Sequence, residues 1–231
     1  MSRKNDIEAL LARADKTEQT IFVKYNKSLQ SKEISADLKI DIKDFFGNLR
    51  SVLDYIAHDI VDTYCPSAKP SNRIYFPIRD DQNKFDIEIN KSYPELLKNK
   101  NSIYIILNDN QPFIIDDNKW LSFFNNLNNE NKHDRLVPQT RVETKNVKVT
   151  NLGGGSVSWG SGVTFGGGVS VMGVLIDPNT QLPVPNNIVK TEIVTWVDFQ
   201  FEDLNVSALW LINESLKKIR KLFSDLSIEL Y

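Results

Sequence analysis

Three residues of one predicted helix could act together on a phosphate group. Arg50, Asp54 and His58 follow one another at intervals of four residues, so on a helix they form a polar ridge beside an apolar stripe. The guanidinium can bind phosphate, and the imidazole can transfer protons near neutral pH. The carboxylate between them can orient the imidazole and raise its pKa. The same spacing fits an ion-pair ladder on a solvated or inter-helix face, which is the commoner arrangement.

A second polar set lies at Asn131–Arg135. Residues 132–148 contain five cations and two acids, and this excess of positive charge could bind phosphate or complement the dipole at a helix end. We expect Arg50 or Asp54 within reach of this segment, in one chain or across a dimer, as a working site or as a clasp that pairs Asp54 with Arg135. The catalytic candidates are Arg50, Asp54, His58 and His133, and the phosphate-binding candidates are Asn131, Lys132 and Arg135.

Other motifs that carry chemistry are missing from the sequence, which has no nucleophile elbow, no H-E-x-x-H, no C-x-x-C and no EF-hand loop. The sequence has only two histidines, which make a poor zinc site, so we expect neither a metal nor a cofactor. Cys65, which has no histidine near it in the sequence, is expected to be inert.

Nine of the ten glycines lie between Gly153 and Gly173. Their spacing matches neither a P-loop nor a dinucleotide-binding fingerprint. Because they alternate with valine and aromatic residues, they indicate bulged or tightly turned strands. The alternative is a mobile hairpin that closes over something bound.

The first candidates must be positioned by helices, which apolar residues at intervals of three and four predict. One stripe runs from Ile7 to Tyr25, and a stronger one runs from Leu38 to Ile60 and ends near Tyr64, before two prolines. Shorter patterns predict strands at 73–78 and 102–107, a helical turn at 93–97, a helix from 116–117 into the asparagine-rich stretch 125–131, strands over 141–201 and a helix over 203–231.

This order predicts an α+β fold: mainly a helical bundle, with an antiparallel β-hairpin or sheet inserted before the C-terminal helix. We expect one domain over residues 1–231, made of a helical part with short strands (1–140), the glycine-rich β insertion (141–201) and a C-terminal helix that packs back on the bundle (203–231). The second and last helices are predicted to pack antiparallel and to bury Leu49, Leu53, Ile56, Leu211, Ile219 and Leu222.

Composition excludes several classes of protein. The 231 residues are 41% hydrophobic and 25% charged, which excludes a disordered chain, and no apolar run approaches the length of a membrane span. A net charge of −2 does not indicate a nucleic-acid or membrane partner. One cysteine, and no charged and apolar leader, predict a cytoplasmic protein.

Four segments resemble, in order, a group of uncharacterised bacterial proteins. They are Asn48–Tyr55 (NLRSVLDY), Tyr75–Ile78 (YFPI), Asn110–Phe113 (NQPF) and Leu127–Leu136 (LNNENKHDRL), where the group has LRSALDH, FPI, QPY and L-x-N-x-DKHR. That group looks like the HEPN superfamily of helical bundles, which are often dimeric. Many HEPN proteins are metal-independent ribonucleases of toxin–antitoxin and phage-defence systems. The resemblance covers about residues 40–136.

The resemblance implies a metal-independent endoribonuclease of a defence system, or a degenerate relative of one. Arg50 matches the signature arginine, but Tyr55 stands where the signature has histidine, and a tyrosine is a poor base at neutral pH. His58 could replace it only across a dimer, and His133 could fold back onto Arg50. The implied partners are a second copy of the chain, RNA or a phosphorylated ligand, and an antitoxin-like protein, with no membrane.

Two other functions remain open at this point. One is a non-catalytic module that senses a nucleotide or phosphorylated metabolite through Arg50, Lys132, His133 and Arg135. The other is a protein-interaction subunit, which docks a partner on the basic face of the C-terminal helix or on the glycine-rich hairpin.

Overall fold

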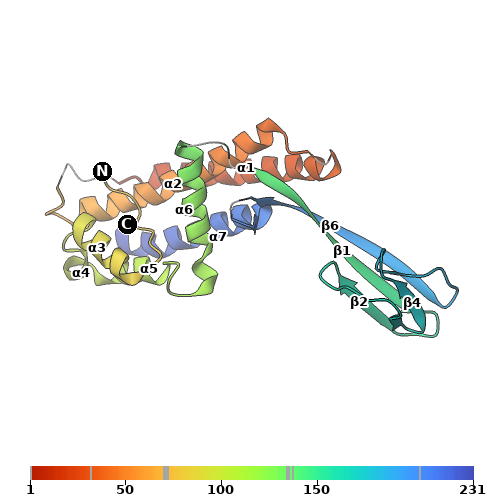
Figure 1. Cartoon of the computed structure of the whole chain (residues 1–231). Helices are drawn as coiled ribbons and strands as arrows, with labels where there is room; N and C mark the ends of the chain where they lie inside the picture. The colour runs from red at the N-terminus through yellow and green to blue at the C-terminus, as the bar shows by residue number, and fades with distance from the viewer. Residues whose placement is uncertain (1, 32, 70–72, 134–135, 137, 203) are drawn as a thin grey trace. The chain divides into compact units, whose positions relative to one another are not determined.

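Figure 1 shows the computed structural model of the chain, which describes residues 2–31, 33–69, 73–133, 136, 138–202 and 204–231. The side chains of residues 30–31, 131–133 and 194–196 also lie outside the description. As predicted, the protein combines helices with antiparallel strands. It divides into two compact units: a helical unit, Met1–Thr140 with Gln200–Tyr231, and a strand unit, Arg141–Phe199. None of the helices in the described ranges has the length and apolar character needed to cross a lipid bilayer.

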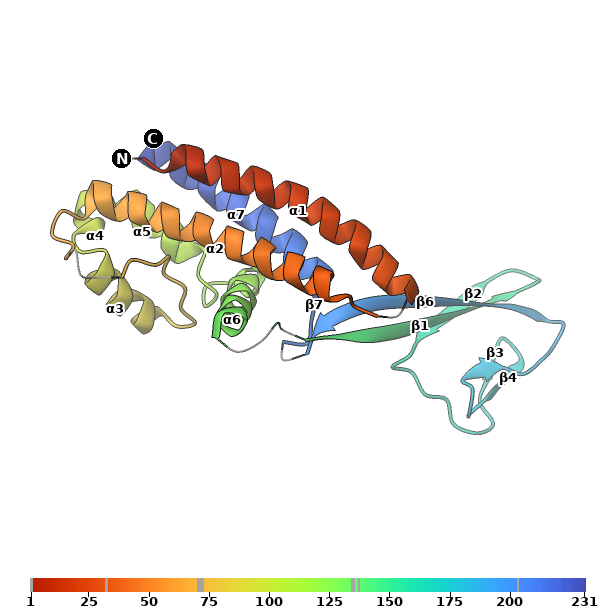
Figure 2. The same ribbon diagram turned by 90° about the horizontal axis from the view of Figure 1, so that it is seen from above.

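The helical unit is built on three long helices, α1 (Lys4–Ser31), α2 (Ala36–Tyr64) and α7 (Ala208–Leu230), which lie side by side (Figure 2). Each forms where the sequence places apolar residues every three or four positions, so these three predicted helices are confirmed. Ser35 and Ser207 act as N-caps of α2 and α7, because each side chain accepts a 3.2 Å hydrogen bond from the backbone amide three residues on.

Shorter helices fill the chain between α2 and the strands. They are α3 (Gln82–Ser92), α4 (Leu96–Asn99), α5 (Asn101–Asp109), the 3-10 turn η1 (Asp116–Asn118) and α6 (Trp120–His133). The strand predicted at 102–107 is wrong: Ile103 and Leu107, four residues apart, are both fully buried on one face of α5. The strand predicted at 73–78 is also wrong, because these residues have no regular secondary structure.

The sequence suggested that the asparagine-rich stretch 125–131 ends the helix, but α6 continues past it. The helix continues to His133 because this stretch still contributes to the interior. Leu127 is fully buried and Asn128 is only 4% exposed. The Asn128 side-chain amide donates a 2.9 Å hydrogen bond to the backbone oxygen of Phe124, one turn earlier.

Helices α2 and α7 run in the same direction, so the predicted antiparallel packing is wrong. The Tyr64 hydroxyl, at the end of α2, donates a 2.7 Å hydrogen bond to a backbone oxygen in the last turn of α7. In the first half of α2, the Phe46 ring lies 6.3 Å from the ring of Phe201, which precedes α7. The Phe46 ring is also 5.9 Å from Phe124 of α6. The chain has therefore returned to the first half of α2 before α7 begins.

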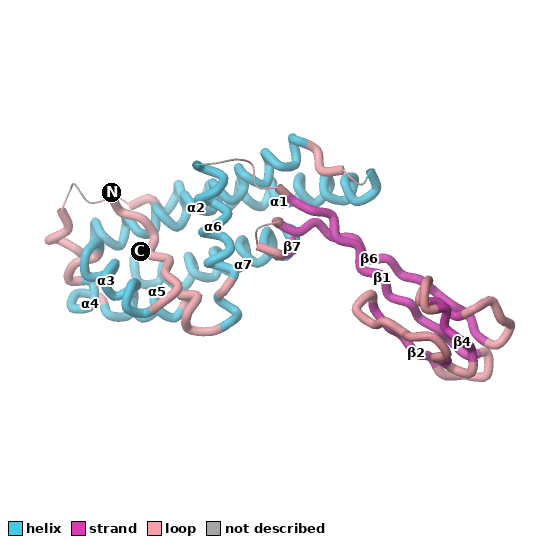
Figure 3. Tube along the Cα trace, viewed as in Figure 1, coloured by secondary structure: helices cyan, strands magenta, loops and turns pink. Residues whose placement is uncertain are grey.

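Seven short and long strands, drawn in Figure 3, lie in the described part of residues 139–207. They are β1 (Gln139–Asn151), β2 (Ser156–Gly160), β3 (Ser170–Val171), β4 (Val174–Asp177), β5 (Leu182–Pro183), β6 (Val189–Phe201) and β7 (Val206–Ser207). One sheet has the order β2-β1-β6-β7 and the other β3-β4-β5. Between β1 and β2 the antiparallel register pairs Val147 with Trp159.

The strand unit has a small apolar core of its own. Its buried members are Val147, Val149, Trp159, Val174, Ile176 and Val189, with Phe165, Val171, Met172 and Leu182 packed against them. The glycines serve the turns between the strands: Gly154, Gly155, Gly168 and Gly173 have positive φ angles. The strands predicted over 141–201, with glycines at their tight turns, are confirmed.

Candidate functional site

Arg50 and Asp54, one turn apart on α2, form a two-pronged ion pair. Arg50 Nε donates to Asp54 Oδ2 at 3.2 Å, and Nη2 lies 3.2 Å from Oδ1. The side chains are only 11% and 19% exposed. Arg50 Nη1 also donates to the side-chain oxygen of Asn125 on α6 at 3.3 Å, and Asp54 Oδ1 accepts a 3.0 Å bond from the backbone amide of Phe76. The pair therefore joins α2 to α6 and to the irregular segment 73–78.

Two tyrosines complete this cluster. The Arg50 guanidinium lies over the Tyr75 ring, 5.9 Å from its centroid. The Tyr93 hydroxyl donates a 2.6 Å bond to the backbone oxygen of Tyr75. Burial, and then the nearby Asp54 carboxylate, raise the pKa of Tyr93 well above its ordinary value, so this hydroxyl stays protonated. Because these contacts lie within the protein, we call this arrangement the Arg50 clasp. The predicted pairing of Asp54 with Arg135 lies outside the described residues.

The other predicted site residues are not seen to join this cluster. The side chain of His58 is half-buried and makes no hydrogen bond or ion pair with the described residues. The backbone of Asn131, Lys132 and His133 forms the last turn of α6, but their side chains, and all of Asp134 and Arg135, lie outside the described residues. The phosphate-binding set at Asn131–Arg135 therefore stays a prediction.

Cys65 fits the prediction of an inert thiol. It follows α2 directly and is 2% exposed. Burial, and to a smaller degree Glu95, raise the pKa of its thiol to about 11. The reactive thiolate form is therefore scarce at neutral pH.

Replacing Arg50 with methionine tests the clasp. The substitution leaves the Asp54 carboxylate partly buried without its cation, so we expect a loss of about 1–3 kcal/mol in the free energy of unfolding, measured with urea. The matched control is Lys84→Met, because Lys84 forms an exposed pair with Asp81 and exposed pairs contribute little. An Arg50 variant as stable as the wild type would contradict the clasp.

A polar pocket that the sequence did not predict lies between α1, α2 and the second half of α6. Its volume is about 650 Å³. It is lined by Arg13, Lys16, Thr17 and Thr20 of α1, by Asp41, Lys43, Asp44, Gly47, Asn48 and Ser51 of α2, and by Asn128 of α6. The spacing of these residues places each set on one face of its helix. In the sequence, Thr17 and Thr20 interrupt the apolar stripe of α1. That interruption was the sequence feature that could have indicated a polar pocket here.

The residues that line the pocket include three cations and two acids. Arg13, Lys16 and Lys43 make no ion pair with any described residue. Of the two acids in the lining, Asp41 is neutralised by Lys24, whose ammonium lies 2.5 Å from the carboxylate. Only Asp44 remains to oppose three cations. A phosphate group, which prefers an arginine and lysine environment, is the kind of ligand that this balance favours.

Gly47 gives the pocket part of its open floor. A glycine inside a helix costs about 1 kcal/mol relative to alanine. A Cβ atom built at Gly47 would meet no atom within 4 Å, so packing within the protein does not require glycine here. The missing side chain leaves the α2 backbone accessible from the pocket.

Three cations on the basic face of α7 have partners within the protein. Lys218 pairs with Asp117, and Arg220 pairs with Asp15 and also donates to the backbone oxygen of Leu11 at 3.2 Å. Lys221 pairs with Asp225 at 2.6 Å, one turn further along α7. These cations hold elements of the helical unit and their neighbours on α7, so they offer a partner less free charge than the sequence suggested.

Comparison of the chain with known proteins finds no matching family model, no similar curated protein and no similar solved structure. The resemblance to HEPN proteins accordingly stays a prediction from the four sequence segments.

Proposed function

We propose that this protein is a non-catalytic module that binds a nucleotide or another phosphorylated metabolite in the pocket between α1, α2 and α6. The observation that carries the proposal is the combination of three lining cations that form no ion pair with a described residue and a helix glycine that packing does not require. Arg13 can bind phosphate oxygens in a bidentate manner, and Lys16 and Lys43 add positive charge.

The Arg50 cluster supports binding more than catalysis. In a ribonuclease of the HEPN type, the arginine would have to face the phosphate, whereas the Arg50 guanidinium donates hydrogen bonds to Asp54 and Asn125. His58 lies on the same face of α2 as Ser51, a pocket residue, but about 10 Å further along the helix at 1.5 Å per residue. A HEPN-like identity, a ribonuclease activity and an antitoxin-like partner are proposals that rest on the sequence resemblance alone.

The proposal is tested by thermal melting and calorimetry with ATP and with inorganic pyrophosphate. A ligand that binds only the folded state must raise the melting temperature. The double variant Arg13→Gln/Lys16→Gln should weaken binding about tenfold or more, because it removes two charge-assisted contacts. Lys217→Gln is the control: its side chain is 75% exposed on α7 and outside the pocket, so binding should not change.

Substitutions at Gly47 test whether a side chain that fills the pocket blocks binding. Gly47→Ala should raise stability by about 0.5–1 kcal/mol and leave binding intact. Gly47→Leu should keep the helix but abolish binding, because the longer side chain occupies the pocket. Binding that persists in both the double variant and Gly47→Leu would contradict the proposal, as would the absence of any melting shift at millimolar ligand. Cleavage of single-stranded RNA in EDTA would replace the proposal with the ribonuclease.

A further inference from the structure

A groove in the strand unit is independent of the phosphate pocket. Its volume is about 280 Å³. It is lined by Lys145 and Val147 of β1, Trp159 and Gly160 of β2, Ser161, Val163, Thr180 and Gln181 of the loops, Leu182 of β5 and Ile193 of β6. All of these residues belong to the strand unit. The volume lies just below the usual range for ligand pockets, about 300–1,000 Å³, so the groove suits a compact molecule.

Gln181 fixes one wall of the groove in place. Its backbone, which has a left-handed φ of 60°, accepts a 3.3 Å hydrogen bond from the Trp159 indole Nε1. Its side chain accepts a 2.6 Å bond from the amide of Phe165 and donates to the Phe165 oxygen at 3.2 Å. The Trp159 and Phe165 rings meet edge to face at 5.1 Å. These contacts satisfy the polar atoms of Trp159 and Gln181, so the wall is preformed and presents mainly apolar surface.

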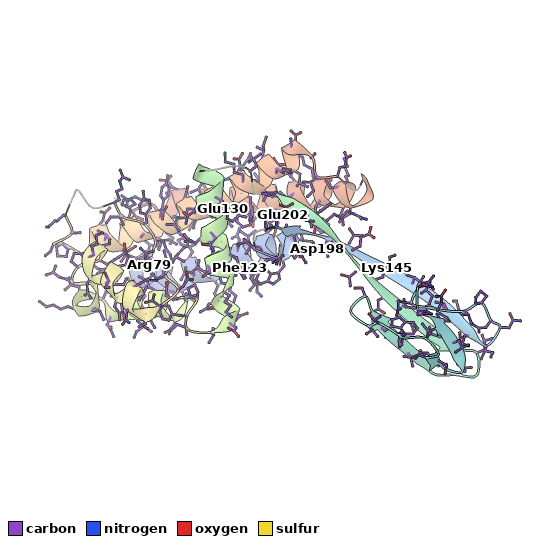
Figure 4. The ribbon with its side chains drawn as sticks, viewed as in Figure 1. Arg79, Phe123, Glu130, Lys145, Asp198 and Glu202 are labelled. Carbon is purple, nitrogen blue, oxygen red and sulfur yellow. The ribbon has the colours of Figure 1, made fainter. Side chains whose placement is uncertain are left out.

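The chemistry of the groove is an apolar slot with one positive charge at its rim. Trp159 is 6% exposed and Val147 7%, whereas Val163 and Ile193 are 44% and 51% exposed. Lys145, labelled in Figure 4, is exposed and has no ion-pair partner among the described residues. A single ammonium matches a singly charged carboxylate, whereas a phosphate dianion would need more donors to replace its hydration.

We propose that this groove binds a compact monocarboxylate with an apolar body. The carboxylate pairs with the Lys145 ammonium, and the body lies against Trp159 and Leu182 between the exposed side chains of Val163 and Ile193. Binding of this ligand requires neither an acidic side chain nor a metal ion in the groove. The ligand differs from that of the phosphate pocket in both charge and polarity.

The experiment uses the full chain with hexanoate and 3-phenylpropionate as probes, and with hexanamide and 3-phenylpropanamide as their uncharged counterparts. A titration followed by ¹H–¹⁵N NMR reports affinity and place together, because the Trp159 indole N–H lies in the groove wall. We expect the acids to shift this signal and to bind about fivefold or more tightly than the amides.

Two variants of β1 form a matched pair. Lys145→Met should remove the advantage of the acids over the amides. Lys148→Met should leave it intact, because Lys148 is also exposed but lies three residues further along the strand and therefore on the opposite face. An unchanged indole signal before ligand is added shows that the groove is folded in each variant.

Several results would overturn the proposal: equal affinities for acids and amides, equal effects of the two lysine substitutions, or no shift of the indole signal at millimolar probe. The phosphate pocket and this groove have no residue in common. The titration therefore tests carboxylate binding in the strand unit independently of whether ATP binds to the helical unit.

Discussion

Replacing Leu53 with alanine should destabilise the protein by about 2–5 kcal/mol, the range for truncating a buried leucine. Leu53 lies near the middle of α2 and has no exposed surface. It belongs to the face of α2 that is buried in the helical unit, where α2 packs on both α1 and α7. The substitution removes apolar contact and leaves a cavity that long, packed helices cannot easily close. Urea unfolding followed by circular dichroism measures the loss.

Ile40→Ala is the control for this substitution. Ile40 lies on the same helix and is 46% exposed, so its truncation should cost at most about 0.5–1 kcal/mol. A Leu53→Ala cost below about 0.5 kcal/mol, which is typical of surface positions, would contradict the packing of α2 described above.

The second large effect is expected at Asp59, a carboxylate that is only 4% exposed. Its oxygens accept hydrogen bonds from the Arg3 backbone amide at 2.9 Å, from the Arg3 guanidinium at 2.7 Å and from the Tyr231 hydroxyl. One side chain of α2 therefore holds the residue just before α1 and the residue just after α7. No charge remains uncompensated as long as the three groups stay together.

Asp59→Asn should lower the free energy of unfolding by about 3 kcal/mol, because hydrogen bonds to a charged group contribute about 1.5–3 kcal/mol each and their effects overlap. The amide keeps the shape of the carboxylate but loses the charge and turns a donor toward donors. Asp62→Asn is the matched control: Asp62 also pairs with Arg3, at 2.9 Å, but is 49% exposed, so its loss should cost about 0.5 kcal/mol. Equal losses in the two variants would contradict the role given to Asp59.

The same contact predicts a dependence of stability on alkaline pH. Partial burial, and then the Asp59 carboxylate, raise the pKa of the Tyr231 hydroxyl above its ordinary value. The folded state therefore holds this proton more tightly than the unfolded state does. The resulting stabilisation is complete below the unfolded pKa of about 10 and is lost as the pH rises toward the folded value. Tyr231→Phe should reduce this slope above pH 10.

The long elements could be predicted because their signal is local. The stripe of α2 and the alternating residues of β1 each determine a period within a dozen residues. The strand predicted at 102–107 failed because an apolar run of five residues, 103–107, fits either a strand or a helix. The burial of Ile103 and Leu107 on one face decides for the helix. The direction of α7 depends on where the end of β6 returns the chain to the helical unit, which no local pattern contains.

The candidate sites divide in the same way. The pairing of Arg50 with Asp54 follows from their spacing, but their bonds to Asn125 and Phe76 join segments 75 and 22 residues apart. The pocket between α1, α2 and α6 combines faces of three helices, none of which is unusual by itself. Its cations are scattered over α1 and α2, so they raise no local excess of charge like the one at residues 132–148.

The division of the chain into units has a consequence for the order in which the protein is made. The strand unit is one continuous stretch, whereas the helical unit needs residues from both sides of it. Residues of α7 that complete the helical core, such as Leu211, Ile219 and Leu226, are synthesised after the whole strand unit. The parts of α1 and α2 that pack on α7 therefore stay exposed while residues 65–207 are synthesised, which takes roughly 7–30 seconds at about 5–20 residues per second. During that interval, chaperones can bind the surface of the α1–α2 hairpin that α7 later covers.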